Sequence, residues 1–227
     1  MSRFARLCQT SIGAKQVMAV TGLLLFGFII GHLVGNLLVF AGRDALNAYA
    51  RKLRELGALL WVVRLALLAV FFAHVGSALR LWRLNRAARP QPYAVAASQA
   101  ATYAGRTIVM SGLLILLYLI YHLMHLTLGV TNPEYLKFVD AKGLPDVYRM
   151  MVTGFSKPAV SGVYIAAMIL LGLHLSHGLT SFFQTVGLNH PAYNACFRRA
   201  GPVAGVAIAA GYIAIPLAVL AGLLKLP

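Results

Sequence analysis

Five long apolar stretches, separated by shorter polar segments, constrain the fold of this 227-residue chain more than any other feature. Each is at least about 20 residues long, which lets an α-helix cross a hydrocarbon core of about 30 Å. Only helices or closed barrels satisfy backbone polar groups in lipid. The sequence therefore predicts an all-α membrane protein, with residues 1–227 as a single integral membrane domain. The predicted transmembrane helices cover residues 17–40, 59–82, 107–129, 158–183 and 201–226.

The composition agrees with a membrane protein, because 60% of the residues are hydrophobic and only 11% are charged. The formal net charge of +15 is high enough to raise the question of a nucleic-acid partner. The basic residues lie at the ends of the apolar stretches, however, and no soluble domain carries a basic face. We therefore expect no nucleic acid, and we assign these charges to the lipid bilayer, where they orient the helices and contact headgroups.

An odd number of spans places the two termini on opposite sides of the membrane. We call the side of the N-terminus side one and the other side two. Lysine and arginine are equally numerous on the two sides, but a dense arginine run from Arg80 to Arg89 directly follows the second stretch on side one. This run predicts a cytoplasmic side one. On side two, residues 41–58 suggest a short surface helix, and residues 131–157 a long loop.

Six of the seven histidines lie in apolar stretches, although a titratable ring in hydrocarbon is costly and usually has a purpose. His32 and His122 each lie about 22 Å along helices that both start on side one. His74 and His174 lie on helices that run the other way, about 12–14 Å from side one. Helix direction therefore predicts two layers, His32 with His122 and His74 with His174.

Two opposed imidazoles at one depth are the ligand set of a bis-His haem, which favours electron transfer over oxygen chemistry. Facing helices of a bundle commonly build such sites. We therefore expect a four-helix bundle that binds two b haems, with a peripheral fifth helix. A proton relay or transporter, and histidines that serve only packing, are the alternatives. Gly27, Gly31 and Gly35 favour either close helix packing or room for a macrocycle beside His32.

Two further histidines, His125 and His177, complicate the choice of ligands. Each follows a proposed ligand by three residues and lies on nearly the same helix face. Depth disfavours His125, which lies too far toward side two. Depth does not separate His177 from His174, so spacing alone leaves the ligand on the fourth helix open.

With these residues in place, the chain resembles the five-helix, di-haem cytochrome b membrane subunit of succinate:quinone oxidoreductase and fumarate reductase. The similarity runs along nearly the whole chain; each piece is weak alone, but the ordered set is specific. The matching pieces are Thr21-Gly22, Phe28-Ile29-Ile30-Gly31-His32-Leu33, His74, Tyr121-His122-Leu123, His174-Leu175-Ser176-His177-Gly178-Leu179 and Ser181-Phe182.

The resemblance implies that His32 and His122 bind the haem distal to the soluble subunits, and that His74 and His174 bind the proximal one. It implies a bacterial cytoplasmic membrane, a cytoplasmic N-terminus, and a flavoprotein and an iron–sulfur protein as partners in a complex that can form a higher oligomer. Electrons would pass between succinate or fumarate and a membrane quinone, which we expect to be menaquinone. The chain has no dinucleotide fingerprint and only two cysteines, Cys8 and Cys196, so flavin and clusters must belong to partners.

Four more residues are candidates for the surroundings of the haems and the quinone. Arg64 lies just inside the second helix, where its partner is either a haem propionate or the membrane interface. Asn36 and Ser181 share faces with His32 and His174 and are candidates for propionate or supporting contacts. Glu55 is a candidate proton acceptor from quinol, with a solvated loop charge as the alternative. Some relatives carry polar residues where this chain has Met18 and Ala19, so their propionate contacts do not transfer.

Overall fold

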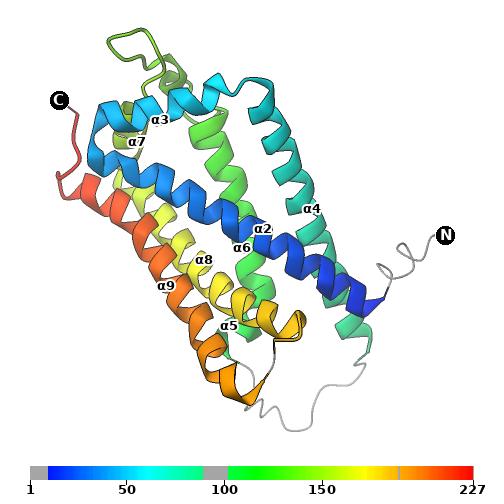
Figure 1. Ribbon diagram of the computed structural model, residues 1–227. Coiled ribbons are helices and arrows are strands. Elements are labelled where there is room, and N and C mark those ends of the chain that lie inside the picture. The colour runs from blue at the N-terminus through cyan, green and yellow to red at the C-terminus, as the bar shows by residue number, and fades with distance from the viewer. Residues whose placement is uncertain (1–9, 89–101, 189, 227) are drawn as a thin grey trace.

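The structure is a computed structural model that describes residues 10–88, 102–188 and 190–226, and its regular elements are helical (Figure 1). The predicted all-α fold is therefore confirmed. The elements are α2 (Ser11–Leu37), η1 (Leu38–Ala41), α3 (Arg43–Glu55), α4 (Ala58–Ala87), α5 (Tyr103–Arg106), α6 (Ile108–His122), η2 (Leu123–Thr127), η3 (Pro133–Lys137), α7 (Val147–Phe155), α8 (Pro158–Thr185) and α9 (Pro191–Leu220).

Within the described residues, five helices are long and apolar enough to cross a membrane: Ser11–Ala41, Ala58–Ala87, Ile108–Thr127, Pro158–Thr185 and Pro191–Leu220. They match the five predicted spans. The largest difference is at α9, which begins at Pro191 rather than at residue 201. Proline suits the first turn of a helix, where its missing N–H costs nothing, and the His190 ring caps this end by accepting from the Ala192 N–H at 3.2 Å.

Helices α8 and α9 form the closest pair in the bundle. They approach at glycines: a Cβ placed on Gly205 would collide with the Gly172 carbonyl oxygen, and one on Gly201 with the Ser176 carbonyl oxygen. Small residues of this kind allow close backbone contact in membranes, where dispersion forces drive packing. Helix α9 therefore lies along α8, outside the four helices that carry the intramembrane histidines, as expected of a peripheral fifth helix.

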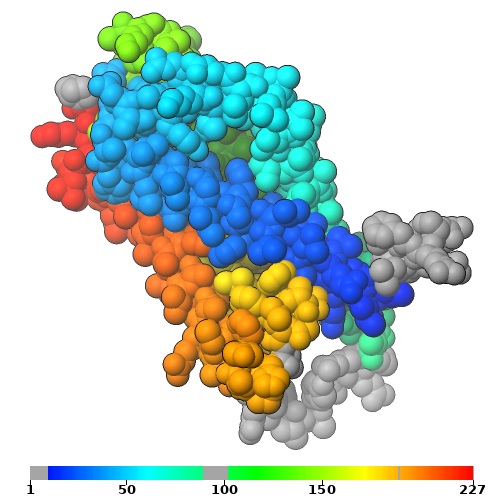
Figure 2. Space-filling view, in the orientation of Figure 1, coloured from blue at the N-terminus to red at the C-terminus, as the bar shows by residue number. Residues whose placement is uncertain are grey.

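The four histidine-bearing helices are packed unevenly. Helix α2 lies against α4 and α8, and α6 lies against α8. Among the described elements, α4 packs extensively only on α2. Its side chains are largely exposed, including Trp61 and Phe72, as expected for a helix that faces lipid. Figure 2 shows the green surface of α6 at the base of a hollow bounded by α2, α3 and α4.

The largest apolar cluster lies at the side-two end, where α3, α7 and the end of α9 meet. Its buried members are Val39, Leu46, Tyr148, Met151, Val152, Phe155, Tyr164, Ile215, Ala218, Val219 and Leu224. The surface helix predicted within residues 41–58 is confirmed as α3. Helix α7 was not predicted, because its nine residues lie in the segment interpreted as a loop. Helix α7 buries one apolar face against α8 and α9. The sequence of residues 131–157 does not show that these helices lie beside it.

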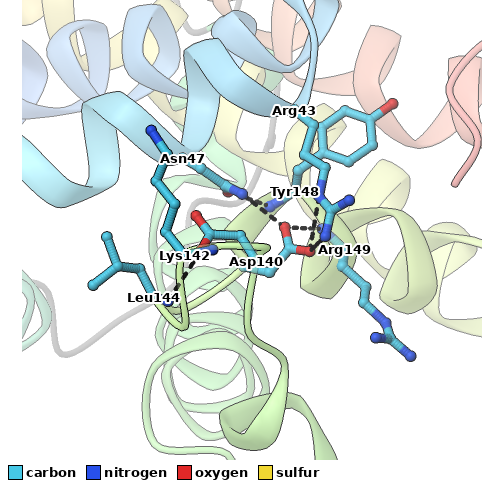
Figure 3. A network of polar contacts seen from close by, with 8 residues as sticks. Arg43, Asn47, Asp140, Lys142, Leu144, Tyr148 and Arg149 are labelled. Atoms are coloured by element: carbon cyan, nitrogen blue, oxygen red, sulfur yellow. Dashed lines mark hydrogen bonds and ion pairs between the residues drawn. The ribbon is translucent and has the colours of Figure 1, made fainter. Parts of the chain in front are cut away.

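Asp146 ties this end of the molecule together. Figure 3 shows its partners Arg43, Asn47 and Arg149 within a network of polar contacts. Its carboxylate accepts from Arg43 Nη2 at 2.6 Å, from Asn47 Nδ2 at 2.8 Å and from the Arg149 N–H at 3.1 Å. Burial alone would raise the pKa of Asp146, but the hydrogen bonds from Arg43, Asn47 and Arg149 hold that pKa below its usual range. Asp146 thus caps α7 and fastens it to α3, which also packs on α2 through Tyr49 and Gly35.

Some sequence expectations fall outside the described residues. These are Cys8 and Arg89, which ends the arginine run. Cys196 is exposed and is a free thiol.

Candidate functional site

The four histidines that sequence depth placed in two layers meet as two pairs of rings. In the side-two pair, the ring centroids of His32 and His122 are 6.0 Å apart with planes at 83°. In the side-one pair, those of His74 and His174 are 6.5 Å apart with planes at 67°. Each pair joins two helices that run in the same direction: α2 with α6, and α4 with α8. The arrangement places two titratable ring pairs one above the other inside four membrane helices.

The side-one pair is held by two hydroxyl groups. His74 Nδ1 lies 3.2 Å from Thr21 Oγ1, and His174 Nδ1 lies 3.3 Å from Ser111 Oγ. Both hydroxyls donate their own proton to a backbone carbonyl, Thr21 to Val17 at 2.6 Å and Ser111 to Ile108 at 3.0 Å. With their protons on these carbonyls, the hydroxyl oxygens are free to accept from the rings, an arrangement that puts the proton of each neutral imidazole on Nδ1 and leaves the lone pair on Nε2.

A glycine beside each hydroxyl makes room for the same ring. A Cβ on Gly22 would lie 3.2 Å from His74 Cε1, and one on Gly112 would lie 3.4 Å from His174 Cε1. Thr21-Gly22 precedes His32 by eleven residues, counted from 21 to 32, and Ser111-Gly112 precedes His122 by eleven, from 111 to 122. Eleven residues are about three helical turns. Each of α2 and α6 thus carries one histidine of the side-two pair and, eleven residues earlier, a hydroxyl residue that contacts a ring of the side-one pair.

The side-two pair has aromatic surroundings. The His32 ring stacks on Phe28 with centroids 5.5 Å apart, and it also meets Tyr212 of α9 at 6.2 Å. Tyr212 donates to the Ile29 carbonyl at 2.8 Å, which fixes its ring beside His32. On the other helix, His122 Nδ1 lies 3.3 Å from the Tyr164 hydroxyl of α8. The side-two rings are therefore positioned by phenols and a stacked phenyl ring rather than by aliphatic hydroxyls.

The structure separates the two histidines that sequence spacing left in question. His125 lies in the π-helical turn η2 and stacks on Tyr121 with centroids 5.4 Å apart and planes at 11°. His177 lies beside α5, where a Cβ on Gly105 would be 3.0 Å from His177 Nδ1. On the fourth helix it is His174 whose ring faces His74. This geometry favours His122 and His174 over their neighbours as partners in the pairs.

The spacing of the ring pairs fits a metal ion between two imidazoles. A metal–imidazole nitrogen bond is about 2 Å long and a ring centroid lies about 1 Å behind its nitrogen, so two opposed rings hold a metal at a centroid separation of about 6 Å. Three of the four rings use Nδ1 for a hydrogen bond within the protein. Their Nε2 atoms are then available as axial ligands, with the other ring nitrogen held by its surroundings as is usual at metal sites.

Parts of α2 and α4 near the histidines are left open by the described helices. Helix α4 reaches α8 at the His74–His174 rings although, among the described elements, its extensive backbone packing is on α2 alone. Within the described part of the chain, a Cβ on Gly27 or Gly31 would meet no atom within 4 Å. Gly35 is different, because its Cβ would collide with the Tyr49 ring. In the glycine row of α2, Gly35 thus allows close packing against α3, whereas Gly27 and Gly31 are exposed.

The four secondary candidates lie in varied surroundings. Asn36 donates through Nδ2 to the carbonyl oxygen of His32, one turn earlier in the same helix, at 2.6 Å. Arg64 is exposed, with its guanidinium carbon 5.1 Å from the centre of the Trp61 ring. Glu55 is exposed at the last position of α3. Ser181 is half-buried near the side-one end of α8, and its carbonyl accepts from the Thr185 hydroxyl at 2.8 Å.

Three residues that position the rings were missed at the sequence level: Ser111, Tyr164 and, in its role, Thr21. The repeated pattern of a hydroxyl residue and a glycine eleven residues before a histidine was a usable signal on both α2 and α6. Nothing comparable marks Tyr164, which lies ten residues before His174 and contacts a different pair. Its role depends on how α6 and α8 are rotated against each other.

No family model, no curated protein and no solved structure matches the chain. The class that fold and site define is a multi-pass helical membrane protein whose bundle brings four histidines together in two pairs.

Proposed function

We propose that the chain is the membrane anchor and electron-transfer subunit of a succinate dehydrogenase or fumarate reductase. In this proposal, His32 and His122 hold one b haem and His74 and His174 hold a second. The observation that carries the proposal is the pair of opposed imidazole couples, at centroid separations of 6.0 and 6.5 Å, on four membrane helices. The ordered motifs around these histidines support the particular family.

Haem supplies reversible one-electron transfer when it is bound. The chain's own residues orient and insulate the site. Thr21 and Ser111 accept from the Nδ1–H groups of the side-one rings, which keeps both Nε2 atoms free of protons. The apolar helices exclude water around all four imidazoles, and Phe28 and Tyr212 pack against His32.

Two features suggest the partners: the sequence has no flavin-binding or cluster-binding motif, and the side-one end of α4 is rich in arginine. A flavoprotein and an iron–sulfur protein would dock on side one, where Arg83 and Arg86 extend from the end of α4 and are exposed. Menaquinone would exchange electrons at side two, with Glu55 as the proposed proton acceptor. The proposed location is the bacterial cytoplasmic membrane, with the N-terminus in the cytoplasm. In this scheme the two layers form an electron path across the bilayer.

An absorption spectrum of the complex purified from its own membranes tests the proposal. We expect a Soret band, b-type peaks that appear on reduction, two haems for each copy of this chain, and a flavoprotein and an iron–sulfur protein that copurify with it. A preparation without these bands would refute the haem assignment and favour a histidine-dependent transporter or proton channel. Haem without succinate- or fumarate-linked electron transfer would retain the ligands and refute the family.

A further inference from the structure

His125 is the most buried of the intramembrane histidines, with 1% of its surface exposed. It is not a member of either ring pair. Its Nδ1 lies 2.9 Å from the Tyr164 hydroxyl, the same hydroxyl that lies 3.3 Å from His122 Nδ1. Tyr164 is itself 5% exposed. A buried phenol therefore bridges two imidazoles, one of which belongs to the side-two pair.

The residues around His125 leave its second nitrogen without a hydrogen bond. Among the described residues, His125 Nε2 and the Tyr135 hydroxyl are buried and have no hydrogen-bond partner. Their rings are neighbours, with centroids 5.6 Å apart, and both lie against Gly154 of α7. An unsatisfied buried polar group costs stability, so an apolar residue would be expected here if packing were the only requirement. A π-helical turn, common at functional sites, places His125 in this position.

The phenol has one proton and faces two Nδ1 atoms, so it donates to one ring and accepts from the other. This step rests on the proposed function: as a haem ligand, His122 uses an unprotonated Nε2, and its neutral ring must then carry the proton on Nδ1. The Tyr164 oxygen accepts that proton's hydrogen bond, and its own O–H donates to His125 Nδ1. The shorter distance, 2.9 Å, is the one to His125.

From this geometry we infer that His125 and Tyr164 are positioning residues for the side-two haem ligand, forming a hydrogen-bond chain from His122 through Tyr164 to His125. A phenol that donates to an imidazole becomes a better acceptor, because linked hydrogen bonds polarise one another. A better acceptor at Nδ1 raises the basicity of the ligand. A more basic ligand stabilises ferric over ferrous iron, so the chain lowers the midpoint potential of the side-two haem.

The side-one pair provides the contrast. Ser111 and Thr21 also accept from Nδ1–H groups, but they donate onward to backbone carbonyls that are already part of helices. No second imidazole polarises them in the described structure. The two haems would therefore differ in the strength of the hydrogen bond at Nδ1, and mutations in the chain should move only one of them.

A redox titration of the intact, haem-loaded complex tests this inference with an isosteric pair of variants. His125→Asn keeps an acceptor near the position of Nδ1, whereas His125→Leu has nearly the same size and no acceptor. We expect His125→Leu to raise the midpoint potential of one haem, His125→Asn to remain close to wild type, and Tyr164→Phe to give the largest positive shift. Ser111→Ala should move the other haem instead.

Equal shifts in the Asn and Leu variants, or a negative shift in Tyr164→Phe, would overturn the inference. If His125→Leu loses the side-two haem while His125→Asn retains it, the hydrogen bond is still responsible, because the two differ little in size. Loss of that haem in both would make His125 a packing residue. Absence of haem from the wild-type complex would instead refute the proposed function, so the two failures are distinguishable.

Discussion

The side-one and side-two histidine pairs share one ring geometry but differ in what supports the rings. Centroid separations of 6.5 and 6.0 Å are nearly the same. Thr21 and Ser111 support the side-one rings from within regular helices, each followed by a glycine that admits the ring. The side-two rings instead depend on Tyr164, Tyr212 and a π-helical turn. The comparison teaches that two imidazole pairs with similar ring spacing can be given different hydrogen-bonding surroundings by the residues around them.

The two ends of the bundle also differ in how well they are packed. Near side one, among the described elements, α4 packs extensively only on α2, and many of its side chains are exposed. At side two, α3 and α7 cover the bundle, and the largest buried apolar cluster includes Tyr164. Covered ends exclude water and fix side chains, so the more elaborate hydrogen-bond chain lies where the fold is best packed.

On the proposed function, the largest expected effect is that each histidine pair loses its haem independently of the other pair. His122→Ala should remove the side-two haem and leave about half the haem content, and His74→Ala should do the same for the side-one haem, because each iron needs both imidazoles. Haem extracted and quantified against protein measures this. His125→Asn, the neighbour control, should retain both haems. If His125→Asn lost a haem that His122→Ala kept, the ligand assignment on α6 would be incorrect.

A second effect tests whether the open face of α2 accommodates a macrocycle. Gly31→Leu should lower the occupancy of the side-two haem and leave the side-one haem in place, since within the described chain no atom lies within 4 Å of a Cβ at Gly31. Gly162→Leu on α8 is the matched control, because a Cβ there also meets nothing within that distance. Normal haem content in Gly31→Leu would mean that this face contacts lipid.

A smaller effect concerns the contact between α3 and α7, the two helices that cover the bundle at side two. The stability that ionised Asp146 contributes is present above the unfolded carboxyl pKa, about 4, and is lost as pH falls through its lowered folded pKa. Asp146→Asn should therefore lose about 1–3 kcal/mol at neutral pH and show a weaker acid dependence than wild type. Thermal unfolding of the detergent-solubilised complex across acidic pH measures both. If the unfolding temperatures of the two proteins changed with pH in parallel, ionisation of Asp146 would not contribute to stability.

The smallest effect is expected at the side-one supports. Thr21→Val keeps the shape of the side chain and removes the oxygen that accepts from His74 Nδ1. Both haems should remain bound, and the midpoint potential of the side-one haem should rise by less than the shift in Tyr164→Phe, because no imidazole polarises Thr21. A shift confined to the side-two haem would reverse the assignment of the two layers.

Much of the fold could be predicted from the sequence, because length and apolarity are enough to define a membrane helix. The pairing of His32 with His122 and of His74 with His174 also followed from helix direction and rise per residue. Helix α7 could not be predicted in the same way. It is only nine residues long, and its stability depends on Asp146 at its start and on the apolar cluster beneath it.

The sequence by itself determined the number of spans, the alternation of their directions and the depths at which His32 pairs with His122 and His74 with His174. The tertiary structure decided which atom faces which: Ser111 beside His174, Tyr164 between His122 and His125, and Gly35 rather than Gly31 against α3. The physical reason is that depth depends only on rise along one helix. A contact depends on how each helix is rotated about its axis and on which neighbour it meets, and both are set by packing between segments that are distant in sequence.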